Sequence, residues 1–233
     1  MIKVENTEVY GWEAAIRGMR NPMNSWEKSD SCYCKEPITT KCNNLGCSHC
    51  GWAWSDLGKN PFCIGDNDMA LMQKLVKAGT DHRKFMRMIT VSCDIIAPLY
   101  WWKQFDTYKV GTVTDSCSTM HKIAEQEFTL DDFSCEHLFN GVEEGTEFLK
   151  DFMYTIKALN KARETYLETK KNIYWWQMIQ LLPSSYNQRR TVVLNYEVLR
   201  NACQARKHHK LDEWFGFYKW AESLPYSELI LEV

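Results

Sequence analysis

The stretch Leu182–Arg206, LPSSYNQRRTVVLNYEVLRNACQAR, is the most informative about the fold. Within a few residues, its sequence pattern changes from one typical of a β-strand to one typical of a helix. Residues 191–195, TVVLN, form a short β-branched run, which is typical of a strand. The following residues, Glu197 to Lys207, have helical spacing. Arg189 and Arg206 stand on either side of this strand and helix.

A second strand is predicted between Arg87 and Ala97, where MITVSCDII carries β-branched residues at alternate positions. This alternation indicates one buried face. Pro98 suits the first turn of the helix PLYWWKQF that follows. Upstream, Asp66 or Asp68 is expected to cap a helix that stops at Gly79.

Long helices dominate the rest of the chain. The clearest runs from about Glu143 to Lys170, and a second, IYWWQMIQLL, ends before Pro183. Another is expected over Leu211–Leu224. The apolar stripe of the first helix is predicted to be core: Phe148, Phe152, Ile156, Leu159 and Tyr166. Few strands, long helices and no strand–helix–strand rhythm predict the α+β class.

Composition and charge exclude several classes of function. The 28 Lys and Arg against 30 Asp and Glu give a net charge of −2, which argues against a general polyanion binder. The longest apolar run, Ile95–Trp102, contains Pro98 and is far shorter than the roughly 20 residues that span a bilayer. The polar start, MIKVENTEVYGW, differs from a signal peptide, so we expect a cytoplasmic protein without membrane association.

Six of the ten cysteines lie between Cys32 and Cys63, inside a predicted loop from Asn21 to Gly65. Short spacings there permit a zinc site from Cys32, Cys34, Cys42, Cys47, Cys50 and His49. Reduced, unligated thiols in an insertion are favoured instead, because no standard spacing joins the two halves, and no metal site is assigned. We expect a single domain, with residues 1–65 as an N-terminal segment carrying the insertion and 66–233 as the main part.

Two features carry chemistry on spacing alone, since no dinucleotide-binding, Walker or hydrolase motif is present. Arg189 and Arg206, one strand and one helix apart, could converge on an anion, and guanidinium forks suit phosphate oxygens. Alternatively, the basic run Arg206–Lys210 is a solvated helix end. Residues 115–119, DSCST, form a hydroxyl-rich turn, which is more often a local cap than a ligand cradle. For each feature, the ligand-binding interpretation and the purely structural one both remain open.

Two blocks covering most of residues 66–230 resemble the flavin-dependent thymidylate synthases, in a divergent form such as phages carry. The first comprises Lys77-Ala78-Gly79, the MITVSCDIIAP strand, Gln104, Lys109-Val-Gly-Thr, Asp115 and Ser118. The second is LPSSYNQRRTVVLNYEVLRNACQAR, where an arginine, a strand ending in asparagine and a second arginine fall at the family's intervals. The family's Arg-His-Arg signature is Thr107-Tyr108-Lys109 here.

The resemblance implies a mixed sheet with long helices packed on it and assigns site residues position by position. The dUMP pocket is expected from Gln104, Asp115, Ser118, Arg189 and Arg206, with Arg206 also catalytic through its charge beside the uracil ring. The flavin side is expected from Thr107, Tyr108, Lys109, Asn195 and His209. His209 follows Arg206 by three residues, where the family has four.

The resemblance further implies reductive methylation of dUMP to dTMP with FAD, NADPH and methylenetetrahydrofolate, in a homotetramer. The cofactor carries the chemistry, so no protein nucleophile is expected. One alternative is a nucleotide-binding protein that kept the dUMP pocket and lost flavin chemistry, prompted by Thr107-Tyr108-Lys109; a related pyrimidine C5-modifying enzyme is another. A zinc-knuckle module binding nucleic acid through Lys207–Lys210 is disfavoured by the net charge.

Overall fold

The computed structural model describes residues 2–33, 62–141 and 147–231. The zinc ligands considered from sequence at Cys34, Cys42, Cys47, His49 and Cys50 lie outside the described residues, as does most of the predicted loop from Asn21 to Gly65.

Four strands form the main sheet in the order β1 (Lys3–Tyr10), β4 (Thr90–Pro98), β6 (Asn187–Asn195) and β5 (Val113–Ser116). The two predicted strands are confirmed as β4 and β6. Burial alternates along β4, as its sequence pattern predicted. β6 begins four residues earlier than predicted, at Asn187, and β1 was not predicted.

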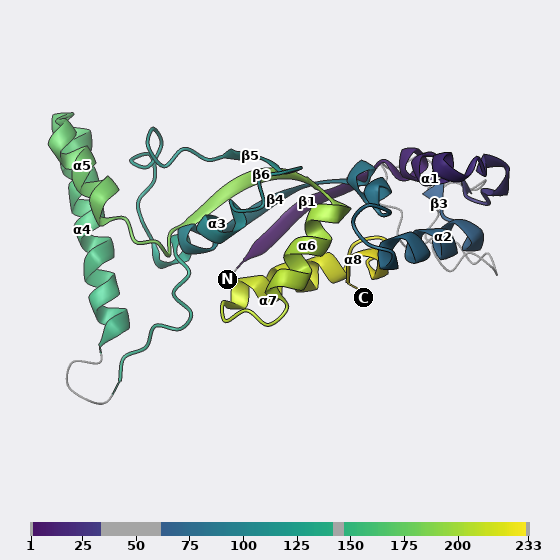
Figure 1. The fold of residues 1–233 in the computed structure, drawn as a ribbon. Helices are drawn as coiled ribbons and strands as arrows, with labels where there is room; N and C mark the ends of the chain where they lie inside the picture. Colours follow the sequence, from purple (N-terminus) through teal and green to yellow (C-terminus); the bar gives the residue numbers. More distant parts are fainter. Residues whose placement is uncertain (1, 34–61, 142–146, 232–233) are drawn as a thin grey trace, which may run out of the picture. The chain divides into compact units, whose positions relative to one another are not determined.

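Helices make up most of the remaining structure, and the expected α+β class is confirmed (Figure 1). Within the described residues, no helix is both long and apolar enough to cross a membrane. The α-helices are α1 (Trp12–Arg20), α2 (Asp66–Lys77), α3 (Leu99–Phe105), α4 (Phe148–Thr169), α5 (Asn172–Leu181), α6 (Tyr196–Arg206), α7 (Asp212–Glu222) and α8 (Glu228–Leu231). Short 3-10 turns are η1 (Asn21–Met23), η2 (Trp26–Lys28), η4 (Lys84–Met88) and η5 (Leu130–Asp132).

The chain forms two compact units, each assembled from separated stretches. The first unit comprises the start of β1 with Ile95–Thr107 and Asp115–Thr191. The second comprises Val4–Asp94, Tyr108–Thr114 and Val192–Val233. The sequence predicts a single domain, with residues 1–65 as an N-terminal segment and 66–233 as the main part. This division stays a prediction.

In the first unit, α4 and α5 pack side by side (Figure 1). Ile156 and Leu159 of α4 and Met178 of α5 belong to one buried cluster, so the central part of the predicted stripe is core. Phe148, at the start of the stripe, is 47% exposed and corrects that prediction. The reason is length: α5 has 10 residues against 22 in α4 and follows its C-terminal end, so it cannot cover the first turns.

In the second unit, α6 packs against α7, α8 and η4, and α1 packs against η4. Trp12 of α1 meets the rings of Tyr196 and Tyr226 edge-on, at centroid distances of 5.1 and 5.0 Å. The buried Tyr196 hydroxyl donates to the Pro225 carbonyl at 2.6 Å. The Tyr226 hydroxyl accepts a hydrogen bond from the Ile64 amide at 3.1 Å. These contacts join residues far apart in sequence into one aromatic core.

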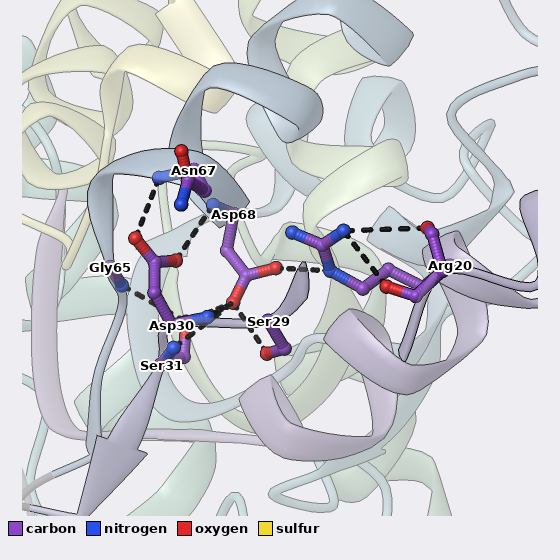
Figure 2. A network of polar contacts seen from close by, with 8 residues as sticks. Arg20, Ser29, Asp30, Ser31, Gly65, Asn67 and Asp68 are labelled. Carbon is purple, nitrogen blue, oxygen red and sulfur yellow. Dashed lines mark hydrogen bonds and ion pairs between the residues drawn. The ribbon is translucent and has the colours of Figure 1, made fainter. Parts of the chain in front are cut away.

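A buried ion pair lies at the start of α2 in the second unit (Figure 2). Arg20 Nε donates to Asp68 Oδ1 at 2.6 Å, and the two side chains are 4% and 0% exposed. The other carboxylate oxygen accepts from the hydroxyls of Ser29 and Ser31 and from the amides of Asp30 and Ser31. Asp68 is therefore fully engaged in tertiary contacts.

The start of α2 corrects the predicted cap. The N-cap residue is Gly65, and no side chain at that position caps the helix. Asp30 takes this role from a distance, because its carboxylate accepts the amides of Asn67 at 2.9 Å and Asp68 at 3.1 Å (Figure 2). The same network adjoins the short antiparallel pair β2 (Cys32–Tyr33) and β3 (Phe62–Cys63).

Candidate nucleotide-binding site

A cavity of about 360 Å³ in the first unit contains two of the predicted nucleotide ligands, Ser118 and Arg189. Its walls come from the turn at residues 117–119, the segment 122–128 and the start of β6 at residues 186–189. This volume falls in the range of small-molecule sites, about 300–1,000 Å³. The structure thus places the hydroxyl-rich turn and the first arginine at one concave surface.

Two hydrogen bonds join the turn to β6, and a third joins α3 to β6. The Cys117 amide donates to the Arg189 carbonyl at 3.0 Å, and Gln188 Nε2 donates to the Cys117 carbonyl at 2.8 Å. Trp102 of α3, itself buried, donates from Nε1 to the Gln188 carbonyl at 3.0 Å. The backbone of residues 188 and 189 is therefore held by the turn and by α3. Ser118 follows directly after Cys117, the turn residue that makes these hydrogen bonds.

Ser118 caps its own turn, as the prediction of a local cap expected, and it also lines the cavity. Its Oγ accepts the His121 amide at 3.0 Å and lies 3.0 Å from His121 Nδ1. The hydroxyl keeps further acceptor capacity, because oxygen carries two lone pairs and one proton. A bound polar group can therefore still meet Ser118.

The pocket mixes both signs of charge. Lys122 forms an ion pair with Glu125, and both line the cavity with Arg189. Asp132, on the wall, is held in a capping box by the Thr129 amide and hydroxyl. Burial raises the pKa of Tyr186, so this phenol stays protonated near neutral pH and can donate a hydrogen bond.

Gln104 and Asp115 belong to the same unit, but neither is among the residues that line this cavity. Gln104 lies on α3, and its carbonyl accepts from the Thr107 hydroxyl at 2.7 Å. Asp115 lies on β5 with an exposed side chain. The structure therefore gathers two of the four predicted nucleotide ligands in this unit, and the roles of Gln104 and Asp115 stay predictions.

The neighbouring Arg190 has a structural role. Its Nη1 pairs with Asp106 at 2.7 Å, its Nε donates to Gln188 Oε1 at 3.0 Å, and its guanidinium lies 4.2 Å from the Trp102 ring centroid. Adjacent residues of a strand point to opposite faces, so the side chains of Arg189 and Arg190 leave β6 in opposite directions. Arg190 is engaged by Asp106, Gln188 and Trp102, whereas Arg189 lines the cavity, and its role as a nucleotide ligand stays a prediction.

Sequence reasoning missed Lys122, Tyr186 and Gln188 as pocket residues. A signal was available for Tyr186 and Gln188, because both lie within the segment SSYNQRR that leads into Arg189. Lys122 had none, since it looks like any lysine of an exposed turn.

In the second unit, three predicted site residues meet around a buried tryptophan. Arg206 Nε donates to the Tyr108 hydroxyl at 3.2 Å, and the guanidinium lies 5.2 Å from the Trp214 ring centroid. The rings of His209 and Trp214 are 6.2 Å apart. Trp214 is 1% exposed, so it forms a rigid base for this group. We call Tyr108, Arg206, His209 and Trp214 the arginine cluster.

Asn195 caps α6, because its Oδ1 accepts the Val198 amide at 3.0 Å. The turn at residues 109–112 lies against it: Gly111 has φ +80°, and a Cβ there would come within 2.7 Å of Asn195 Nδ2. Only glycine permits this approach. Lys109, the retained cation of the signature, begins this turn, with its carbonyl accepting the Thr112 amide.

The predicted residues are divided between the units. Thr107 belongs to the first unit with Arg189, whereas Tyr108 and Lys109 belong to the second with Arg206. The expectation that Arg189 and Arg206 hold one nucleotide therefore stays a prediction.

Comparison with solved structures identifies the fold. The flavin-dependent thymidylate synthase ThyX from Helicobacter pylori, complexed with FAD and dUMP, is similar over 99% of this chain and 98% of its own, with a TM-score of 0.64 and 16% identity. The UMP/dUMP methylase PolB from Streptomyces cacaoi, bound with 5-Br dUMP, is similar over 98% of this chain and 94% of its own, with a TM-score of 0.57 and 13% identity. Neither a scan against protein-family models nor a search of curated protein sequences found a match. The chain has the ThyX fold, as the sequence resemblance implied.

Proposed function

We propose that this protein is a FAD-dependent thymidylate synthase that methylates dUMP at C5, with methylenetetrahydrofolate as carbon donor and NADPH as reductant. One observation carries the proposal: the cavity that places Ser118 beside Arg189, in a fold whose solved examples are complexed with FAD and dUMP. We keep the expected cytoplasmic location and homotetramer as parts of the same proposal.

Arg189 supplies the phosphate contact in this proposal. A guanidinium fork matches two phosphate oxygens, and its charge persists at all physiological pH values. The Ser118 hydroxyl and the protonated Tyr186 phenol add neutral hydrogen-bond partners for the sugar and phosphate. Of the three carboxylates on the wall, Glu125 is paired with Lys122, whereas Glu127 and Asp132 keep their negative charge, so the contact with Arg189 must outweigh their repulsion of the anion.

Arg206 belongs to the second unit, and its place beside the pyrimidine ring is proposed from the sequence resemblance. Its charge would stabilise an enolate-like uracil oxygen as electron density builds up during attack from C5. A lysine at this position could not present two parallel N–H groups, so Arg206→Lys is expected to lower kcat even if dUMP still binds.

The residues around the turn 109–112 fit a flavin. The Thr112 hydroxyl is buried and has no hydrogen-bond partner within residues 2–33, 62–141 and 147–231, so it is available to a bound group. Lys109 begins the same turn and supplies a cation for the flavin diphosphate. Thr107, Asn195 and His209 are assigned to the flavin by resemblance alone. When bound, the flavin supplies the electrons and relays the one-carbon unit.

A homotetramer agrees with the surface of the α4–α5 pair. Phe148, Tyr154, Ile173 and Trp176 are 47%, 56%, 62% and 48% exposed. The two helices thus carry large exposed apolar side chains that a partner subunit would cover in the proposed tetramer. By contrast, Trp101 and Trp102 are buried in the core, so only some of the tryptophans are available to a partner. Sedimentation-equilibrium centrifugation of the full chain tests the tetramer.

The deciding experiment follows the product. Purified protein is incubated with dUMP, FAD, NADPH and methylenetetrahydrofolate, and dTMP is measured by mass spectrometry with each component omitted in turn. We expect a flavin absorbance spectrum, dTMP formation that needs every component, and loss of dUMP binding in Arg189→Ala but not in Arg17→Ala, an exposed arginine of α1. A protein that takes up no FAD and forms no dTMP contradicts the proposal.

The second candidate is a nucleotide-binding protein without flavin chemistry, favoured by the Thr107-Tyr108-Lys109 triplet, in which Tyr108 accepts a hydrogen bond from Arg206. It is supported if dUMP raises the melting temperature while FAD uptake and turnover stay at background. Replacing dUMP with UMP in the same assays tests the third alternative, a related enzyme acting at C5 of another pyrimidine nucleotide.

A further inference from the structure

We propose that Tyr108 is a positioning residue, which holds the Arg206 guanidinium in the orientation that binds the nucleotide. This assigns Tyr108 a role different from the flavin contact implied by resemblance, and it rests on the proposed function of Arg206. It also accounts for a tyrosine in the middle of the signature triplet.

The geometry of the hydrogen bond carries the first step. Arg206 donates to the Tyr108 hydroxyl through Nε, at 3.2 Å. Nε lies on the inner edge of the guanidinium, so this bond leaves Nη1 and Nη2 as a pair at the far end of the side chain. Those two nitrogens form the fork that matches two oxygens of an anion or of a polarised carbonyl group.

The rings of the arginine cluster restrict the same guanidinium further. It lies 5.2 Å from the Trp214 centroid and 6.0 Å from the Tyr108 centroid, and the two rings are inclined at 71° to each other. Both distances are within the range of cation–π attraction. Two rings and one hydrogen bond together leave little rotational freedom, which lowers the entropy lost when a ligand binds.

Charge pairing separates Arg206 from three other arginines that are buried or part-buried. Arg20 pairs with Asp68, Arg83 pairs with Glu197 and Arg190 pairs with Asp106. Across the part of the chain that the structure describes, Arg206 meets no carboxylate. Its partners are neutral, so its positive charge is available to an anionic or electron-rich ligand.

A neutral phenol suits this position better than a second cation. A protonated histidine at residue 108 would repel the guanidinium, whereas the tyrosine oxygen accepts its N–H and adds an aromatic face. His209, on the other side of Trp214, accepts the Leu211 amide at Nδ1, at 3.1 Å. Arg206 is therefore the fixed cation of the arginine cluster.

The test is a double-variant cycle on the full chain with dUMP as the probe. Tyr108→Phe removes the hydroxyl and keeps the ring. We expect it to raise the dUMP Kd and KM about tenfold, the usual scale for a hydrogen bond to a charged group, with a smaller effect on kcat. In an Arg206→Lys background, Tyr108→Phe should change the Kd less than twofold. Tyr218→Phe on α7 is the matched control and should leave the Kd unchanged.

Equal losses in both backgrounds, or no loss in either, would overturn the positioning role while leaving the proposed function intact. A wild-type protein that does not bind dUMP would end the proposed function itself. An independent readout is the side-chain Nε–H signal of Arg206 in nitrogen-15 NMR, assigned with Arg206→Lys. It should exchange slowly with water in the wild type and rapidly in Tyr108→Phe, without nucleotide present; rapid exchange in both proteins contradicts the hydrogen bond.

Discussion

Replacing Asp68 with Asn should strongly destabilise the second unit. The substitution keeps the size of the side chain but removes its charge, and it leaves the guanidinium of Arg20 buried without a counter-charge. Removing one partner of a buried ion pair costs about 3–5 kcal/mol. The serine hydroxyls and backbone amides that meet Asp68 Oδ2 would also face an amide group, which accepts fewer hydrogen bonds than a carboxylate.

The expected change in melting temperature follows from these figures. One kcal/mol shifts the melting temperature of a chain this long by about 2–4 °C, so Asp68→Asn should lower it by roughly 6–20 °C. Thermal unfolding followed by far-ultraviolet circular dichroism measures the shift. Asp66→Asn, an exposed carboxylate in the same first turn of α2, is the matched control and should change the melting temperature by less than about 2 °C.

The pH dependence gives a second test of the same network. Burial alone would raise the pKa of Asp68, but hydrogen bonds from Ser31, Ser29 and Arg20 outweigh it and hold this pKa below its ordinary value. A lowered folded-state pKa stabilises the protein above the unfolded pKa, about 3.9, and that stabilisation is lost as the pH falls through the folded value. Wild-type stability should therefore fall below about pH 4 more steeply than that of Asp68→Asn. If Asp68→Asn melts within 2 °C of the wild type at pH 7, the network of Figure 2 does not stabilise the fold as argued.

Two further predictions use contrasts within the chain. Arg190→Ala should lower the melting temperature, because it removes the ion pair with Asp106 and the contact with Trp102, and it should change the dUMP Kd less than twofold. Arg189→Ala should raise the dUMP Kd strongly and change the melting temperature little. Isothermal titration calorimetry measures the Kd of both variants, and thermal unfolding measures their melting temperatures. Burial raises the pKa of Cys93 and of Cys203 to about 12, so both thiols should resist Ellman's reagent at pH 8 in the folded protein. Cys117 is exposed on the pocket wall and should react, and dUMP should slow that reaction; a rate unaffected by saturating dUMP counts against the pocket.

Sequence reasoning found the strands and helices whose burial follows a regular period. β4 alternates between buried and less buried residues, so its β-branched positions were visible in the sequence. β1 was missed because it is an edge strand of the sheet and Val9 is its single buried residue. Its sequence therefore shows no alternation of buried and exposed positions. β6 starts earlier than predicted because its polar first residues, NQRR, lie between two neighbouring strands whose pairing overrides their low β propensity.

The site was predictable only in part, for a different reason. A strand's two-residue period separates Arg189 from Arg190, but the sequence does not say which of the two faces α3, because that depends on Asp106 and Trp102. Likewise, Asp68 looked like a helix cap, and its bond to Arg20 spans 48 positions. Local patterns predict local hydrogen bonds well, whereas tertiary contacts reassign polar residues that the local pattern had already placed.

The arginines show how a charge count along the chain differs from the charge available for function. In a charge count from the sequence, Arg20, Arg83, Arg190 and Arg206 each contribute one positive charge. In the structure, the first three pair with carboxylates, whose negative charge offsets the charge of the guanidinium. Arg206 instead contacts the Tyr108 phenol and the Trp214 indole, which position the guanidinium without neutralising its charge. Desolvating an unpaired cation is unfavourable, and cation–π attraction recovers only part of that free energy. The remainder is regained when an anion or a polarised oxygen binds, so this arrangement favours ligand binding at the expense of the stability of the ligand-free protein.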